Sequence, residues 1–208
     1  MPDQPATTFN HHREQIWQQL AEQLNATFHD EIGWERDRVT ALLDRWRVVL
    51  DIHVYPGWHM QQHFTRLRTA FVNPQDFVFN VHRNGPLGQL ADVTRLDRLT
   101  RDIKTGSGAF DRHFTIHAND PRKAQALFSN PRIQQLLEQA GDVRLEIRPD
   151  DGELGPEFPP GVDELRLEVA DRVNNLTRLR AFYDLFSEIL HTLCQLGTAC
   201  DADPQVEL

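Results

Sequence analysis

The chain has 208 residues, of which 39 % are hydrophobic and 9 % aromatic, so it is long enough to bury a sizeable core. Its 31 acidic and 22 basic side chains give a net charge of −9, which opposes the positive field that binders of nucleic acids and anionic membranes need. This balance disfavours a nucleic-acid partner and a membrane partner, and the simplest organisation is one domain over residues 1–208.

No targeting or membrane segment is predicted. The N-terminal stretch has neither a basic start nor an apolar segment, and no run of eighteen apolar residues occurs. We therefore expect a cytoplasmic protein with flexible ends at residues 1–9 and 201–208. Cys194 and Cys200 flank Gly197 at a spacing unlike that of a zinc pair, and a reducing compartment favours free thiols. No motif predicts a cofactor.

The first half of the chain predicts one helix followed by strands. Apolar residues in 10–25 recur at helical spacing, whereas those in 45–55 alternate with a period of two. Further strands are predicted at 39–43, 64–72 and 77–82, the last two joined by the turn-forming Asn73-Pro74-Gln75-Asp76. This succession is typical of a meander.

The second half predicts a strand, two short helices, two strands and a long helix. Residues 84–107 lack a clean period and are expected to form a long connection that includes a short helix around 90–101. Alternation over 110–117 predicts a strand with His113 and His117 on its polar side. Asp120-Pro121 and Asn130-Pro131 each place a capping residue before a proline, which predicts two helices, the second of which ends at Gly141. Strands at 143–147 and 165–169 are expected to pair before a helix over 174–196.

Together these elements predict an α+β fold. We expect an antiparallel sheet of six to eight strands, with the N-terminal, middle and long C-terminal helices packed on one face. The apolar stripe of the last helix is wide, which suggests a homodimer through that helix as an alternative to binding another protein.

Two groups of residues are candidate sites. Asp51, His53, His59 and His63 offer a carboxylate and three imidazoles, a donor set that suits zinc, although no HExxH general base accompanies them. Arg45, Arg47, Arg66 and Arg68 lie on neighbouring predicted strands and are candidate contacts for an anion or a partner. The alternative for these arginines is cross-strand pairing with acidic side chains such as Asp51. His113 and His117 lie about 13 Å apart on an extended strand, too far to share one ion.

The second half of the chain resembles a family of conserved bacterial hypothetical proteins over about residues 100–200. The shared features are Asp102-Ile103, Thr105-Gly106, Phe110-Asp111, Phe114-Thr115-Ile116, Asn119-Asp120-Pro121, Leu127-Phe128, Val143-Arg144-Leu145-Glu146, Phe158-Pro159, Gly161-Val162-Asp163-Glu164-Leu165, Leu179, Leu193-Cys194 and Gly197. This resemblance implies no activity and therefore no catalytic residue. The order of elements is also similar to that of type III secretion chaperones, which grip a partner polypeptide.

These observations favour a non-enzymatic protein-binding or regulatory module, chaperone-like or immunity-like, that acts through the open face or an edge of the sheet. One alternative is a metal-dependent hydrolase that uses Asp51, His53, His59 and His63. A second alternative is a nucleic-acid binder that uses Arg45, Arg47, Arg66 and Arg68.

Overall fold

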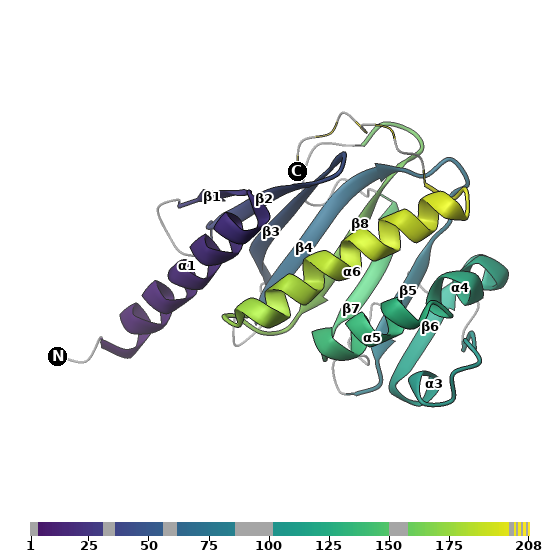
Figure 1. Cartoon of the computed structure of the whole chain (residues 1–208), viewed down its shortest axis with the longest axis horizontal. Helices are drawn as coiled ribbons and strands as arrows, with labels where there is room; N and C mark the ends of the chain where they lie inside the picture. The colour runs from purple at the N-terminus through teal and green to yellow at the C-terminus, as the bar shows by residue number, and fades with distance from the viewer. Residues whose placement is uncertain are drawn as a thin grey trace.

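The structure is a computed structural model, and it describes residues 4–30, 36–55, 62–85, 102–149 and 158–199, with positions 202, 204, 206 and 208. The described residues form an α+β fold of an eight-stranded antiparallel sheet and helices (Figure 1). The elements in chain order are α1 (Gln4–Leu24), β1 (Thr27–His29), β2 (Arg38–Leu43), β3 (Trp46–Tyr55), β4 (Gln62–Val72), β5 (Phe79–Arg83), α3 (Phe110–His113), β6 (Phe114–Ala118), α4 (Pro121–Phe128), α5 (Pro131–Ala140), β7 (Arg144–Pro149), β8 (Val162–Val169) and α6 (Leu176–Gln195). None of the described helices is long and apolar enough to cross a membrane.

The strands follow the order β1-β2-β3-β4-β8-β7-β5-β6 across the sheet. The predicted meander is present for β2, β3 and β4, but β5 does not continue it. Instead β8 pairs with β4 and with β7, and β7 pairs with β5. The turn between β4 and β5 is fixed by Asn73, whose side chain bonds both the carbonyl and the amide of Phe77. Strands β8 and β7 therefore lie between β4 and β5, and β6 forms one edge of the sheet.

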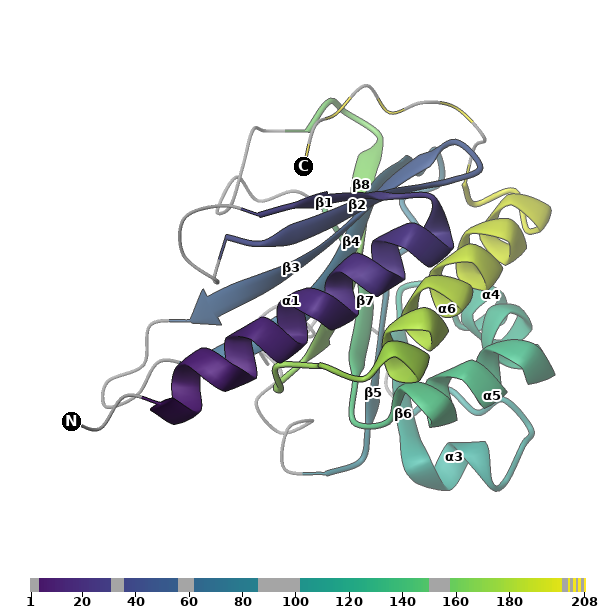
Figure 2. The same ribbon diagram turned by 60° about the vertical axis from the view of Figure 1, so that its left-hand side comes forward.

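The helices α1, α4, α5 and α6 lie on one face of the sheet, as predicted (Figures 1 and 2). The long helix α6 crosses the middle of this face and contacts α1 on one side and α5 on the other. Trp17 of α1, Phe186 of α6 and Leu136 of α5 are almost fully buried between the helices and the sheet. Burying such a side chain stabilises the fold by about 1.5 to 3 kcal/mol, so this layer holds the sheet in place. We call the opposite side of the sheet the helix-free face.

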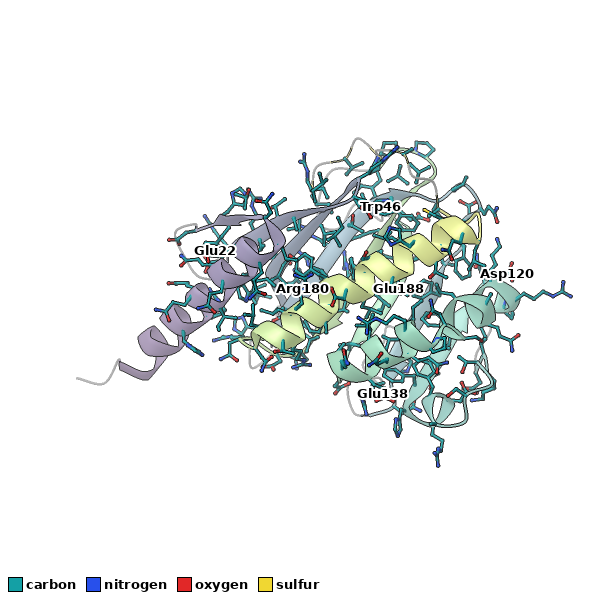
Figure 3. The ribbon with its side chains drawn as sticks, in the orientation of Figure 1. Glu22, Trp46, Asp120, Glu138, Arg180 and Glu188 are labelled. Atoms are coloured by element: carbon teal, nitrogen blue, oxygen red, sulfur yellow. The ribbon has the colours of Figure 1, made fainter. Side chains whose placement is uncertain are left out.

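The apolar stripe of α6 is used within the chain. Leu179, Phe182, Phe186, Ile189, Leu190 and Leu193 are completely buried. A homodimer through this stripe would require α6 to leave its own core, so the predicted dimer surface is wrong. The exposed side of α6 is polar and carries residues such as Arg180 (Figure 3).

The two proline-started helices form as predicted. Asp120 accepts hydrogen bonds from the amides of Arg122 and Lys123, and Asn130 accepts one from the amide of Arg132. Helix α5 ends at Gly141, whose φ of +86° lies in the region that glycine tolerates best.

The predicted strand over 110–117 is partly wrong. Residues 110–113 form the single helical turn α3, and the strand begins only at Phe114. The turn is held by Asp111, whose carboxylate accepts bonds from the amide and hydroxyl of Thr105. The residues of β6 alternate in direction as predicted, with Phe114 and Ile116 in the core, but His117 on the opposite side is buried, whereas it was expected to be exposed. Helix α1 also begins earlier than predicted, and the short strand β1 was not predicted. The expected helix at 90–101 and the thiol of Cys200 lie outside the described residues.

Candidate functional site

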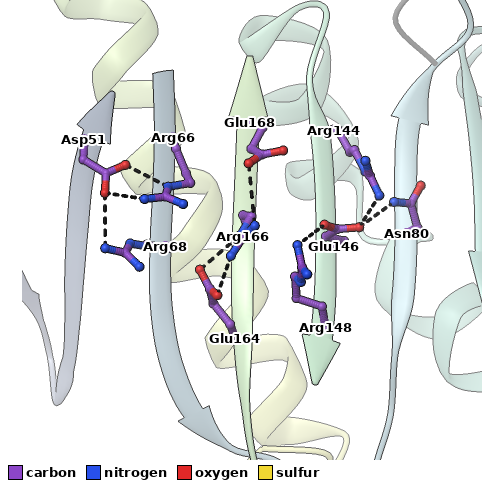
Figure 4. Close-up of polar contacts among 10 residues, drawn as sticks. All are labelled: Asp51, Arg66, Arg68, Asn80, Arg144, Glu146, Arg148, Glu164, Arg166 and Glu168. Atoms are coloured by element: carbon purple, nitrogen blue, oxygen red, sulfur yellow. Dashed lines mark hydrogen bonds and ion pairs between the residues drawn. The ribbon is translucent and has the colours of Figure 1, made fainter. Parts of the chain in front are cut away.

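The helix-free face carries an extended set of charged side chains. Alternation along β3, β4, β8 and β7 turns every second residue away from the helices, and on this face most of these residues are Asp, Glu or Arg. We call this set the charged lattice (Figure 4). It consists of Asp51, Arg66, Arg68, Arg144, Glu146, Arg148, Glu164, Arg166 and Glu168, with Asn80 at its end on β5.

The register of the strands arranges these charges in rows across the sheet. One row runs from Asp51 through Arg66 and Glu168 to Arg144, so that neighbouring side chains alternate in sign. Directly opposed charges of unlike sign stabilise a sheet, by about 0.2 to 1 kcal/mol per pair at ordinary sites. The next row breaks this rule, because Arg68 lies directly opposite Arg166.

The lattice is held by paired hydrogen bonds between guanidinium and carboxylate groups. Arg66 donates through Nε and Nη2 to the two oxygens of Asp51, each at 2.8 Å. Arg68 reaches the same carboxylate at 3.3 Å.

The same pattern continues on the next strands. Arg166 donates to Glu164 at 3.1 and 2.8 Å, and its Nη1 lies 3.8 Å from Glu168. Glu146 accepts from both Arg144 at 2.8 Å and Asn80 at 2.9 Å. Such two-bond pairs fix the planes of both partners, so the charged groups are preorganised.

The centre of the lattice is buried. The side chain of Arg166 is 3 % exposed and those of Glu164 and Glu168 are 8 % exposed. Burial by itself lowers the pKa of Arg166, but the hydrogen bonds and charge of Glu164, with the charge of Glu168, raise it overall. Burial raises the pKa of Glu168, and the nearby carboxylate of Glu146 adds to this effect. Towards the rim, Arg144 is 27 % exposed and Arg148 is 15 % exposed.

Several donors of the lattice have no acceptor. Within the described part of the chain, Nη1 of Arg66, Nε of Arg68, Nε of Arg144 and Nη1 of Arg166 are buried without a hydrogen-bond partner. An unsatisfied buried donor costs about 1 to 3 kcal/mol and calls for an explanation.

Three histidines lie beside the lattice on the same face. His82 and His117 meet edge to face with ring centroids 5.7 Å apart, and His82 Nδ1 lies 3.0 Å from Asn80 Oδ1. Burial and then the neighbouring His117 lower the pKa of His82. Burial, with the charge of Arg66, lowers the pKa of His53 to about 4. The imidazoles of His53 and His82 are therefore neutral at pH 7.

The candidate metal ligands are not brought together on one face. His63 lies opposite Val54 in the register, which places it on the helix-covered face, whereas Asp51 and His53 point to the helix-free face. The carboxylate of Asp51 is bonded by Arg66 and contacted by Arg68. Among the described residues no three His, Cys, Asp or Glu side chains are grouped to hold an ion. His59 lies outside the described residues.

The four candidate arginines divide into two pairs. Arg66 and Arg68 belong to the lattice, where they contact Asp51 in the cross-strand pairing given as the alternative. Arg47 is exposed at the edge of the same face, and Arg45 is exposed in the turn between β2 and β3.

His113 and His117 also lie apart. His113 is exposed beside α5, where its Nδ1 lies 2.6 Å from a carboxylate oxygen of Glu138. His117 is buried against His82. The helical turn at 110–113 therefore does not bring the imidazoles of His113 and His117 together at a common site.

Ser187, His191 and Asp44 form a chain of side-chain contacts at the surface of α6. His191 of α6 places Nε2 at 2.8 Å from Asp44 and Nδ1 at 3.4 Å from Ser187. Asp44 and His191 are 60 % and 50 % exposed, so this contact is an exposed link between α6 and the β2–β3 turn.

The sequence contains a signal for the lattice in two of its strands. Arg144-Leu-Glu-Ile-Arg148 and Glu164-Leu-Arg-Leu-Glu168 have opposite charges at alternate positions. Paired antiparallel, they place Arg144 opposite Glu168, Glu146 opposite Arg166 and Arg148 opposite Glu164. Complementary charge on two predicted partner strands can therefore reveal such a site.

Comparison with known proteins adds little. No family model matches the chain, and no curated protein matches it. Among solved structures, the mycobacterial trehalose monomycolate transport factor A, TtfA, is similar with a TM-score of 0.42 at 10 % identity, covering 86 % of this chain and 95 % of that chain. A likeness this distant transfers neither a site nor a role, so the functional argument depends on the residues themselves.

Proposed function

We propose that the protein is a non-enzymatic binding module that recognises a polypeptide partner through the helix-free face of its sheet. The observation that carries this proposal is the charged lattice, in which rows of Asp, Glu and Arg cross four neighbouring strands on the face opposite the helices (Figure 4). A face arranged in this way offers fixed charges of both signs to a partner of complementary charge.

The cost of the lattice supports a role beyond folding. Buried ion pairs contribute little net stability, because the desolvation of both groups offsets most of their attraction. Apolar side chains of similar volume often serve a fold equally well or better. Arg166, Glu164 and Glu168 at the centre are thus better explained if they hold the rim residues, such as Arg144 and Arg148, in a fixed orientation.

The chemistry of the described side chains favours binding over catalysis. The carboxylates of Asp51 and Glu164 on the helix-free face are neutralised by arginines, and the imidazoles of His53 and His82 have lowered pKa values. A chaperone-like or immunity-like protein grips a partner without chemistry, and a sheet face with fixed charges suits that task.

Photo-crosslinking from two positions tests this proposal. Phe64 lies on the helix-free face opposite His53, and a photoreactive phenylalanine analogue can replace it with little change in shape. The same analogue at Arg180, which is 46 % exposed on the outer side of α6, is the matched control. The full-length chain is expressed in its native cells for both variants.

The expected result is a discrete crosslinked product from position 64 and none from position 180. The product should weaken when Arg144→Glu reverses a rim charge, and should be unchanged by Arg180→Glu in the position 64 variant. Equal products from both positions, or a product unaffected by Arg144→Glu, would refute recognition through this face.

A further inference from the structure

We propose that three arginines on β4 and β8 form a binding site for a carboxylate group of the partner polypeptide. The site comprises Arg66, Arg68 and Arg166, and we call it the arginine cluster. This inference rests on the proposed function, because it names the chemical group that the helix-free face would receive.

The first support is the placement of like charges. Arg68 lies directly opposite Arg166 in the register, and Arg66 precedes it by two residues on the same face. Like charges at opposed positions of a sheet destabilise it. Asp51 reduces this repulsion from the β3 side, and the carboxylate of Glu164, which bonds Arg166, opposes the lowering of the pKa of Arg68 by burial. A further anion between the guanidinium groups would reduce the repulsion more.

The second support is the set of unused donors. Nη1 of Arg66 and Nε of Arg68 have no hydrogen-bond acceptor within the described residues, and Nη1 of Arg166 has only the carboxylate of Glu168, at 3.8 Å. The side chains of Arg66 and Arg166 are 7 % and 3 % exposed, so water outside the protein does not satisfy these donors. Two or three such donors match the oxygens of one carboxylate.

The third support is the charge count of the lattice. Its positive side chains are Arg66, Arg68, Arg144, Arg148 and Arg166, and its negative ones are Asp51, Glu146, Glu164 and Glu168, an excess of one positive charge. A carboxylate carries one negative charge, whereas a phosphate monoester carries about 1.5 to 2 at pH 7. The match in charge favours a carboxylate, the group to which Arg66 and Arg166 already bind within the chain.

Arg68 provides the point of entry. Its side chain is the most exposed of the cluster at 14 %, and its contact with Asp51 at 3.3 Å is longer than the 2.8 Å contact of Arg66. A shift of Arg68 away from Asp51 therefore exposes the unused donors with the smallest loss of contacts.

Nuclear magnetic resonance of the arginine Nε–H groups tests the site directly. The full-length ¹⁵N-labelled protein is titrated with sodium acetate against sodium chloride at constant ionic strength. The Nε–H signal of Arg68, identified by its loss in Arg68→Gln, should shift and saturate, with half-saturation on the order of 10 mM for so small a ligand. The Nε–H of Arg180, which donates to Asp184, is the control and should not saturate.

Two further titrations define the ligand. Inorganic phosphate should saturate the Arg68 signal only at higher concentration than acetate. A capped tripeptide, acetyl-Gly-Glu-Gly-amide, should saturate it at lower concentration than acetate, because backbone contacts with the face add to the carboxylate. Equal affinity of peptide and acetate would overturn the polypeptide source.

A chemical shift of the Arg68 Nε–H that changes without saturation, like that of Arg180, would overturn the carboxylate site. Saturation by phosphate at a lower concentration than by acetate would overturn it as well. Failure of the site is distinguishable from failure of the proposed function. If position 64 gives a crosslinked product but the Arg68 signal does not saturate with acetate, recognition through the helix-free face is retained and only the proposed carboxylate site is refuted.

Discussion

Replacing Arg166 by methionine removes the most buried charge of the lattice while keeping a side chain of similar length. The guanidinium makes two hydrogen bonds to Glu164, at 3.1 and 2.8 Å, and lies 3.8 Å from Glu168. The variant leaves both carboxylates, each 8 % exposed, without this cation. Breaking a buried ion pair by removing one partner costs about 3 to 5 kcal/mol, because a buried charge remains uncompensated.

The matched control is Arg180→Met. Arg180 contacts Asp184 at 3.2 Å on α6, but the two side chains are 46 % and 38 % exposed. An exposed pair of this kind contributes about 0.3 to 0.5 kcal/mol. The structure thus predicts that the two arginine variants differ about tenfold in their loss of unfolding free energy.

Urea unfolding followed by tryptophan fluorescence measures both losses, since Trp17 and Trp46 are buried in the core. If Arg166→Met is too unstable to refold, Glu164→Gln provides a milder change, with an expected loss of about 1.5 to 3 kcal/mol. A loss below about 1 kcal/mol for Arg166→Met, similar to that of the control, would refute the description of the lattice as a buried, mutually dependent network.

Three further changes have defined outcomes in the same unfolding assay. His53 has a folded pKa of about 4 against an ordinary 6.5, so the folded state binds its proton less readily and stability falls as the pH drops from 6.5 to 4. After a discount for the partial exposure of His53, its contribution to the loss of unfolding free energy is about 1 kcal/mol. On acidification His53→Gln should therefore lose about 1 kcal/mol less unfolding free energy than wild type. Equal losses in the two proteins would contradict this assignment. Phe186→Ala should cost about 3 to 5 kcal/mol because Phe186 is completely buried, and a loss below 1 kcal/mol would contradict the placement of α6. Asn130→Ala removes the cap of α5 and the bond to Glu188, with an expected loss of about 1 kcal/mol, and Asn130→Asp should restore the cap but not that bond.

The fold class follows from local patterns. Period-two alternation in residues 45–55 and 64–72 gives β3 and β4, and the proline-started helices follow from Asp120 and Asn130. The helical turn at Phe110–His113 could not be predicted from alternation, since it depends on the bond from Asp111 back to Thr105. The periodicity of a segment reflects only its own residues and does not reveal a hydrogen bond to another segment, such as the bond between Asp111 and Thr105.

The charged lattice could be predicted only in part. The alternation of β3, β4 and β8 already turned Asp51, Arg66 and Glu168 to one side. Which charges become neighbours depends on the insertion of β8 and β7 between β4 and β5, a pairing between segments about 100 residues apart. The face of His63 likewise depends on its register with Val54, because a slip of one residue would reverse it.

The most direct test of the central claim separates stability from recognition in one variant. Glu164→Leu, Arg166→Met and Glu168→Leu together replace the centre of the lattice by apolar side chains. Because such replacements are often neutral or stabilising, the triple variant should unfold at the same or a higher urea concentration than wild type. Its crosslinked product from position 64 should nevertheless be lost. A triple variant that retains the product at wild-type yield would contradict the claim that these charges serve recognition.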